Sequence, residues 1–301
     1  MLKKVTVTNY IGESITMDLF NPSKSGFNIK SIDGLGPGKA TINTKPLSIV
    51  DGSIYNSSKV ESRNIVLNLG FDGNDIESIR HKSYKFFPIK SEVTLKIETD
   101  ERFLNIKGHV ESNEPNIFSD KEDTNISIIC PDPWFWADSE LRFDFAQATA
   151  LFEFPFSNES LIDRLIIFGL IEDVTTKSVN YIGDVPTGVV GELQFKGPAE
   201  NIHVYNIDSQ NGIHINTTKV TAIMNGVALK NQDSIFFSTV DGDKYCVLLR
   251  EGVYYNILNA VDQNSVWFKL RKGDNRVAYA AEKGQDNMNM VLEARILFEG
   301  A

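Results

Sequence analysis

The stretch Ile129-Cys130-Pro131-Asp132-Pro133-Trp134-Phe135-Trp136 places two prolines, a cysteine and three aromatic residues near the middle of the chain. Each proline fixes φ, lacks a backbone donor and disfavours helix at the residue before it. Neither a helix nor a central strand can therefore continue through this stretch. The pattern predicts a seam between two domains, one over residues 1–136 and one over residues 137–301.

The aromatic residues of this stretch need a surface to pack against, because a large ring buries roughly 150–250 Å². Two interpretations stay open: a plug between the domains, which the rigid prolines favour, or an anchor in an interface with another subunit. The candidate seam or interface residues are Cys130, Pro131, Asp132, Pro133, Trp134, Phe135 and Trp136.

The overall composition fits a folded two-domain protein, since the chain has 301 residues of which 42% are hydrophobic. No run of about 18 apolar residues occurs, and the N-terminus leads into an alternating pattern, so we expect no membrane insertion and synthesis in the cytoplasm. Two cysteines predict neither a disulfide framework nor a metal site. The net charge of −10 argues against a protein that grips a nucleic-acid backbone.

The first half of the chain alternates polar and apolar residues over short segments separated by turn residues, which predicts antiparallel strands. One helix is expected over 76–86, capped by Asn74 or Asp75 and ended by Pro88. A hairpin is expected from the segments 92–98 and 103–110. Further strands are expected in 4–19, on both sides of Gly12, and over 27–32, 63–71 and 125–129, with more strand in 40–62.

The second half shows no comparable helix, and short strands with turns between them predict a β-sandwich. Two hairpins are expected, around Asn225-Gly226 and around Asp241-Gly242. The segments 266–270 and 277–280 are expected to be strands on either side of the turn 272–275. Other strands are expected over 152–156, 164–171, 189–195, 202–207, 212–216 and 291–298.

The order of these features resembles the distal tail (Dit) proteins of siphophages, long-tailed bacteriophages with non-contractile tails. The matching pieces, in sequence order, are the strand 63–69, the helix 75–88 with Arg80 and Tyr84, the strand 102–110 ending in Gly108-His109-Val110, the Cys130 to Pro133 seam, and the turns 183–188 and 270–275. The resemblance covers almost the whole chain.

The resemblance implies a structural protein of the tail tip, or baseplate, in the virion. Its N-terminal antiparallel β domain with one helix would form a hexameric ring, and its C-terminal domain would be a galectin-like or carbohydrate-module-like β-sandwich. The partners it implies are further copies of the chain, the tail tube protein, the tail-associated lysin or spike, and a receptor-binding protein. An acidic protein suits a passage for DNA, because it does not bind phosphate.

No enzymatic, cofactor or metal site is expected. The loop from Gly34 to Gly38 lacks the Gly-Lys-Ser/Thr ending and the strand-to-helix context of a phosphate-binding loop. The four histidines offer no ligand set, because only His203 and His214 fall within one local region and a metal site there would need a third ligand. Acidic pairs such as Asp241 with Asp243 lie in turns, where charges are usually solvated, and a cell-wall hydrolase stays only a third possibility.

The aromatic residues of the second half indicate an alternative function, in which the chain is a carbohydrate-binding surface protein used in host attachment. Tyr255, Trp267 and Tyr279 are the candidate contacts to a glycan or to a protein partner. Alternation in strands puts about half of such residues in the core, so that of Trp267 and Phe268 one is expected inside and one outside.

Overall fold

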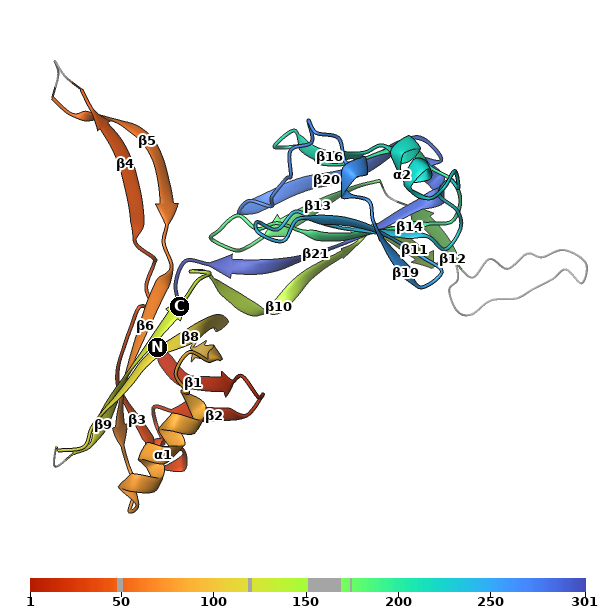
Figure 1. Ribbon diagram of the computed structural model, residues 1–301. Helices are drawn as coiled ribbons and strands as arrows, with labels where there is room; N and C mark the ends of the chain where they lie inside the picture. The colour runs from red at the N-terminus through yellow and green to blue at the C-terminus, as the bar shows by residue number, and fades with distance from the viewer. Residues whose placement is uncertain (48–50, 119–120, 151–168, 174) are drawn as a thin grey trace, which may run out of the picture. The chain divides into compact units, whose positions relative to one another are not determined.

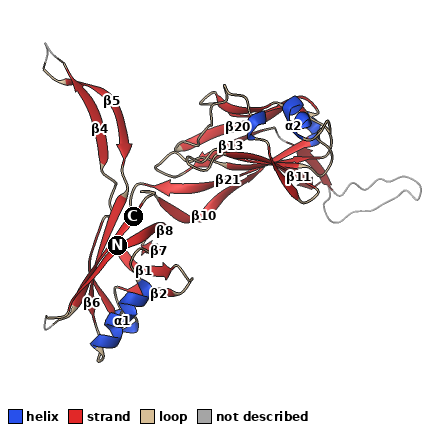
Figure 2. Ribbon diagram, in the orientation of Figure 1, coloured by secondary structure: helices blue, strands red, loops and turns tan. Residues whose placement is uncertain are grey.

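The computed structural model describes residues 1–47, 51–118, 121–150, 169–173 and 175–301 (Figure 1). Strands dominate the described chain, and Figure 2 shows little helix beside them, which confirms the predicted mainly β fold. The chain divides into two compact units, Met1–Asp138 with Leu297–Ala301, and Ser139–Ile296. The predicted domain bounds, 1–136 and 137–301, and the ring-forming role of the first domain stay predictions.

The first unit contains a continuous antiparallel sheet in the order β2-β1-β7-β8-β9-β6-β3, with β4 and β5 as a separate two-stranded ladder. Its elements are β1 (Leu2–Asn9), β2 (Ser14–Asp18), η1 (Pro22–Lys24), β3 (Phe27–Asp33), β4 (Ala40–Pro46), β5 (Ser53–Val60), β6 (Arg63–Phe71), α1 (Ile76–Phe86), β7 (Glu92–Thr99), β8 (Phe103–Asn116) and β9 (Asp123–Cys130). β10 (Phe135–Asp144) begins in this unit and pairs with β8 through Trp136 and Ala137.

The long strand β8 joins the two halves of this sheet. Its first half pairs with β7 and its second half with β9, and the β8–β9 register shifts between Val110 and Ser112. Such irregularities bend a strand and let it pass from one layer to another. Gly108 lies beside this bend, where an added Cβ would come within 2.8 Å of the Cys130 sulfur.

The core of the first unit follows the period of two that its strands show. Buried residues alternate with polar ones in β1, β6, β7 and β9, as expected for a sheet with one covered face. Helix α1 is confirmed over Ile76–Phe86, with the Asp75 carboxylate accepting the Ser78 backbone N–H at 3.1 Å. Phe86 and Phe87 are its buried apolar residues, while Ile76 and Ile79 are half-buried.

The second unit is a β-sandwich. One sheet has the order β19-β18-β17-β14-β21-β10 and the other the order β13-β20-β15-β16. The Tyr279 hydroxyl of one sheet donates to the Met288 carbonyl of the other at 3.0 Å. The elements are β11 (Ala146–Ala150), β12 (Gly169–Asp173), β13 (Thr176–Tyr181), β14 (Val190–Phe195), β15 (Glu200–Asn206), β16 (Asn211–Ile215), α2 (Thr217–Ile223), β17 (Ser234–Ser238), β18 (Tyr245–Arg250), β19 (Val253–Asn256), η2 (Leu258–Ala260), β20 (Gly273–Lys283), η3 (Gln285–Asn287) and β21 (Met288–Phe298).

The hairpin predicted around Asn225-Gly226 is wrong, because the chain forms helix α2 just before these residues. Asn216 caps the helix by accepting the Lys219 N–H at 3.1 Å. Asn225 and Gly226 both have positive φ, 54° and 89°, and the Gly226 N–H bonds back to the Thr221 carbonyl. An Asn-Gly pair supplies the left-handed residues that end a helix as readily as those of a hairpin turn.

Three other predictions for the second unit had different outcomes. The hairpin around Asp241-Gly242 is confirmed by the pairing of β17 with β18. Residues 266–270 are not a strand, because their ladder pairing is limited to a single isolated bridge between Leu270 and Thr187. The turn predicted at 272–275 instead runs into β20, which starts at Gly273. The strand predicted over 152–156 and most of that over 164–171 lie outside the described residues.

Candidate assembly interface

The β4–β5 ladder is a two-stranded arm of the first unit, and we call it the arm. It extends away from the other strands of that unit (Figure 1). Every residue of β4 is exposed, and every residue of β5 except Val60, which is half-buried. The arm is held by its own antiparallel pairing, from Ala40 opposite Val60 to Pro46 opposite Ser53.

Both faces of the arm carry apolar side chains that the chain itself leaves open. Ile54 and Tyr55 are neighbours in β5 and so point to opposite faces, and they are 56% and 61% exposed. On β4, Ile42 is 62% exposed. An isolated two-stranded ladder is marginally stable in water, and exposed apolar surface marks an interaction site. The arm therefore has the properties of a segment that is covered by a partner.

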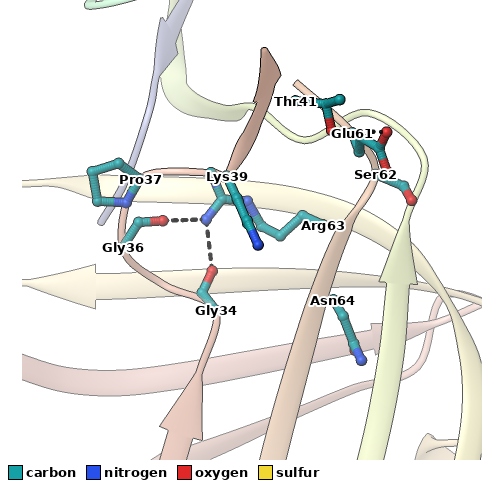
Figure 3. Close-up of a pocket in the computed structure, with 10 residues that line it drawn as sticks. Gly34, Gly36, Pro37, Lys39, Thr41, Glu61, Ser62, Arg63 and Asn64 are labelled. Carbon is teal, nitrogen blue, oxygen red and sulfur yellow. Dashed lines mark hydrogen bonds between the residues drawn. The ribbon is translucent and has the colours of Figure 1, made fainter. Parts of the chain in front are cut away.

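The base of the arm is fixed by Arg63, the first residue of β6 (Figure 3). Its guanidinium donates to the Gly34 carbonyl at 2.6 Å and also to the Gly36 carbonyl, both in the loop that leads into β4. Two further donors reach the carbonyls of Pro133 and Glu299, each at 2.7 Å. The same guanidinium lies 4.7 Å from the centre of the Phe135 ring.

Arg63 is only 6% exposed, and in the described chain its hydrogen bonds go to carbonyl oxygens instead of carboxylates. Burial lowers the pKa of the Arg63 guanidinium, but an arginine stays charged in proteins. The planar guanidinium can donate to several carbonyls at once, whereas a lysine ammonium could not reach all of them. One side chain thus ties together the loop before the arm, the proline-rich seam and the C-terminal segment of the first unit.

The glycine-rich loop has a steric role at this base. Gly34 has φ +87°, and a Cβ there would lie 2.2 Å from the Asn64 carbonyl oxygen. The loop and the start of β6 line an open hollow of about 590 Å³, to which Lys39, Thr41 and Glu61 also contribute. Since the Gly34 and Gly36 carbonyls accept from Arg63, the loop is held at the base of the arm by this side chain.

The seam residues predicted from the sequence all lie in the first unit. Cys130 and Phe135 are fully buried, whereas Trp134 and Trp136 are half-buried and Pro131 and Asp132 are exposed. Burial raises the pKa of the Cys130 thiol to about 11, so this thiol stays protonated and unreactive at neutral pH. The Asp132 carboxylate accepts the Trp134 N–H at 3.2 Å, and Pro133 is half-buried.

The three aromatic residues predicted as glycan or partner contacts are not brought together. Tyr255 is 36% exposed on β19, and Trp267 is half-buried in the segment between η2 and β20. Tyr279 is 1% exposed and belongs to the sandwich core, so its ring offers no face to a ligand. For this residue the structure corrects the expectation, because β20 turns Tyr279 inward.

The histidines His203 and His214 are cross-strand partners on β15 and β16, with ring centres 5.9 Å apart. Burial, together with the charge of His214, lowers the pKa of His203. In the described parts of the chain, no three histidine, cysteine, aspartate or glutamate residues are grouped to hold a metal ion. No described helix is long and apolar enough to span a bilayer.

Comparison with known proteins gives matches at the level of structure only. No protein-family model and no curated protein sequence matches this chain. The SPP1 Dit protein, described as a paradigm of the hub adsorption apparatus of phages that infect Gram-positive hosts, is 12% identical with a TM-score of 0.64, and the match covers 96% of this chain and 98% of that one. The phage P2 baseplate in its activated conformation with calcium is 13% identical with a TM-score of 0.48, covering 98% of each chain.

At this level of identity, the likeness to SPP1 Dit concerns the fold. It extends over almost the full length of both chains and includes both units. The chain therefore has the fold of a phage hub protein. The resemblance to distal tail proteins predicted from the sequence is confirmed at the level of the fold.

Proposed function

We propose that this chain is a non-enzymatic structural subunit of a bacteriophage tail tip, a hub that assembles with copies of itself into a hexameric ring. The observation that carries the proposal is the arm, whose apolar residues are exposed on both faces. The fold likeness to a hub protein of a phage adsorption apparatus supports it.

A ring is the assembly that we propose for such an arm. If the arm of one subunit contacts a different surface of the next, the interface is heterologous, and heterologous interfaces close into rings when the rotation between subunits divides a circle. The free backbone groups along the arm would pair with, or be covered by, the neighbouring copy. Covering Ile42, Ile54 and Tyr55 would supply apolar burial that the single chain lacks.

Within the virion, such a ring would join the tail tube protein on one side to the tail-associated lysin or spike and the receptor-binding protein on the other. The acidic net charge of −10 suits a ring through which DNA passes, because an acidic lumen does not retain phosphate groups.

Native mass spectrometry and light scattering of the full chain at tens of micromolar test the proposal. We expect a hexamer, or a multiple of it, and loss of that species in a variant that combines Ile42→Ser, Ile54→Ser and Tyr55→Ser. Val253→Ser with Tyr254→Ser is the matched control, since these exposed residues lie on β19 of the second unit. A wild-type protein that remains monomeric and forms no ring in reconstituted tails would contradict the proposal.

A further inference from the structure

Trp267 lines a small open hollow of the second unit, of about 250 Å³. The other residues that line it are Pro186, Ser209, Asn211, Lys269 and Arg271. Ser209 comes from the turn between β15 and β16 and Asn211 is the first residue of β16, whereas Trp267, Lys269 and Arg271 come from the segment before β20. Aromatic, amide, hydroxyl and cationic groups thus meet in a space of about the size of one sugar residue.

The segment that carries Trp267 is held rigidly, although it is not a strand. Phe268 and Leu270 are buried, and Leu270 exchanges two backbone hydrogen bonds with Thr187, at 2.8 and 3.1 Å. The Val266 N–H donates to the Gly212 carbonyl at 3.0 Å. Because these neighbours are fixed, Trp267 presents its ring without much loss of conformational freedom on binding.

The Arg271 backbone is fixed as well. The Asn275 side chain, itself 3% exposed, accepts the Arg271 N–H at 2.9 Å and donates to the Arg271 carbonyl at 2.7 Å. No carboxylate of the described residues pairs with the Arg271 guanidinium. Its donors are therefore available to a ligand.

The hollow is positively charged in a protein of net charge −10. None of its described lining residues is acidic, and two are cationic. The Lys244 ammonium lies 5.9 Å from the centre of the Trp267 ring, and Asp241 pairs with both Lys244 and Lys269. Cations therefore outnumber carboxylates around this ring, which favours an anionic ligand over a neutral one.

We propose that this hollow binds an acidic sugar residue of a surface polysaccharide. The apolar face of the sugar ring would stack on Trp267, and its carboxylate or phosphate would accept hydrogen bonds from the Arg271 guanidinium, which suits such groups in a bidentate manner. Asn211 and Ser209 would bond to sugar hydroxyls. This role is independent of ring assembly, because it uses only residues of the second unit.

A glycan microarray with neutral, uronic-acid-containing and phosphorylated glycans tests the proposal on the full-length protein. We expect binding to acidic glycans above neutral ones, loss of at least about tenfold in signal with Trp267→Leu, and loss of the preference for acidic glycans with Arg271→Gln. The matched control is Arg142→Gln, an exposed arginine of the same unit that pairs with Glu293. Oligomers measured by light scattering should be the same for all variants.

Three results would overturn the site. The first is no glycan bound above background by a folded protein. The second is binding that Trp267→Leu and Arg271→Gln leave unchanged. The third is inorganic polyphosphate competing as well as an acidic oligosaccharide, because polyphosphate has charge but no sugar ring, and equal competition would mean nonspecific attraction by the cations.

Discussion

The first unit contains two hairpins of similar pairing and opposite environment, the arm and the β7–β8 hairpin. In β7, every second residue is buried, namely Val93, Leu95 and Ile97, and each of them is at most 1% exposed. In β4, no residue is buried at all. Both ladders are formed by backbone hydrogen bonds. Only the β7–β8 ladder also gains the apolar burial that stabilises a folded domain.

This difference indicates which part of the unit is structural and which is available for assembly. A hairpin that packs on a core stabilises its own chain. A hairpin that stands free has exposed edges and faces, which proteins normally protect. Under the proposed ring assembly, a second copy of the chain would cover the arm.

The largest effect is expected from truncating the core hairpin. Leu104 of β8 is fully buried, so Leu104→Ala should lower the free energy of unfolding by about 2–5 kcal/mol. Ile42→Ala in the arm is the matched control and should change it by less than about 0.5 kcal/mol in the monomer. Urea denaturation measures the free energy of unfolding of both variants. Equal losses in the two variants would remove the distinction between the hairpins.

The sequence predicts the core hairpin well because burial leaves a period of two in it, and it predicts α1 because the cap at Asp75 and the stop at Pro88 are local signals. It fails at α2, where the Asn225-Gly226 pair fits two kinds of turn and the cap at Asn216 decides between them. It also fails at residues 266–270, where Phe268 and Leu270 are buried in the core although the segment does not join a sheet.

The second-largest loss of stability is expected at Arg63, which joins the base of the arm to the core; we call this contact the joint. Arg63→Met keeps much of the apolar bulk but leaves the carbonyls of Gly34, Gly36, Pro133 and Glu299 without this donor. We expect a loss of about 2–3 kcal/mol in the free energy of unfolding, and a smaller loss for Arg63→Lys.

Arg80→Met is the control for Arg63→Met. Arg80 is a more exposed arginine that pairs with Glu77 and Glu122, so its loss should cost about 1 kcal/mol or less. Urea denaturation compares the three variants. If Arg63→Met costs no more than Arg80→Met, Arg63 does not hold the joint.

Arg63 also shows which sequence signal points to the base of the arm. It lies two residues before Ile65 in an alternating strand and therefore on the same face as Ile65, Leu67 and Leu69, which are all fully buried. A charge at an inward position is the available signal. Its partners are not predictable, because they are backbone carbonyls from segments distant in sequence.

A smaller effect concerns the mobility of the arm and not its stability. Hydrogen exchange followed by mass spectrometry should show the amides of β4 and β5 exchanging at least about 100-fold faster than those of β7 and β8 in the monomer, because the arm opens without disturbing a core. In the assembled oligomer the arm amides should become protected. An arm that is already protected in the monomer would contradict its dependence on a partner.

The smallest effect is expected in a third hairpin, β15–β16, which has one face in the sandwich core and His203 and His214 on the other. Because burial and His214 lower the pKa of His203, the unfolded chain binds this proton more tightly than the folded one. Its stabilising contribution is present above the ordinary histidine pKa of about 6.5 and is lost as the pH falls through and below that value. Melting temperatures between pH 7.5 and 5 should therefore fall less in His203→Gln than in the wild type, with His81→Gln, an exposed histidine of α1, as the control. An unchanged slope in His203→Gln would mean that partial cover by one sheet face is too little to make this histidine sensitive to protonation.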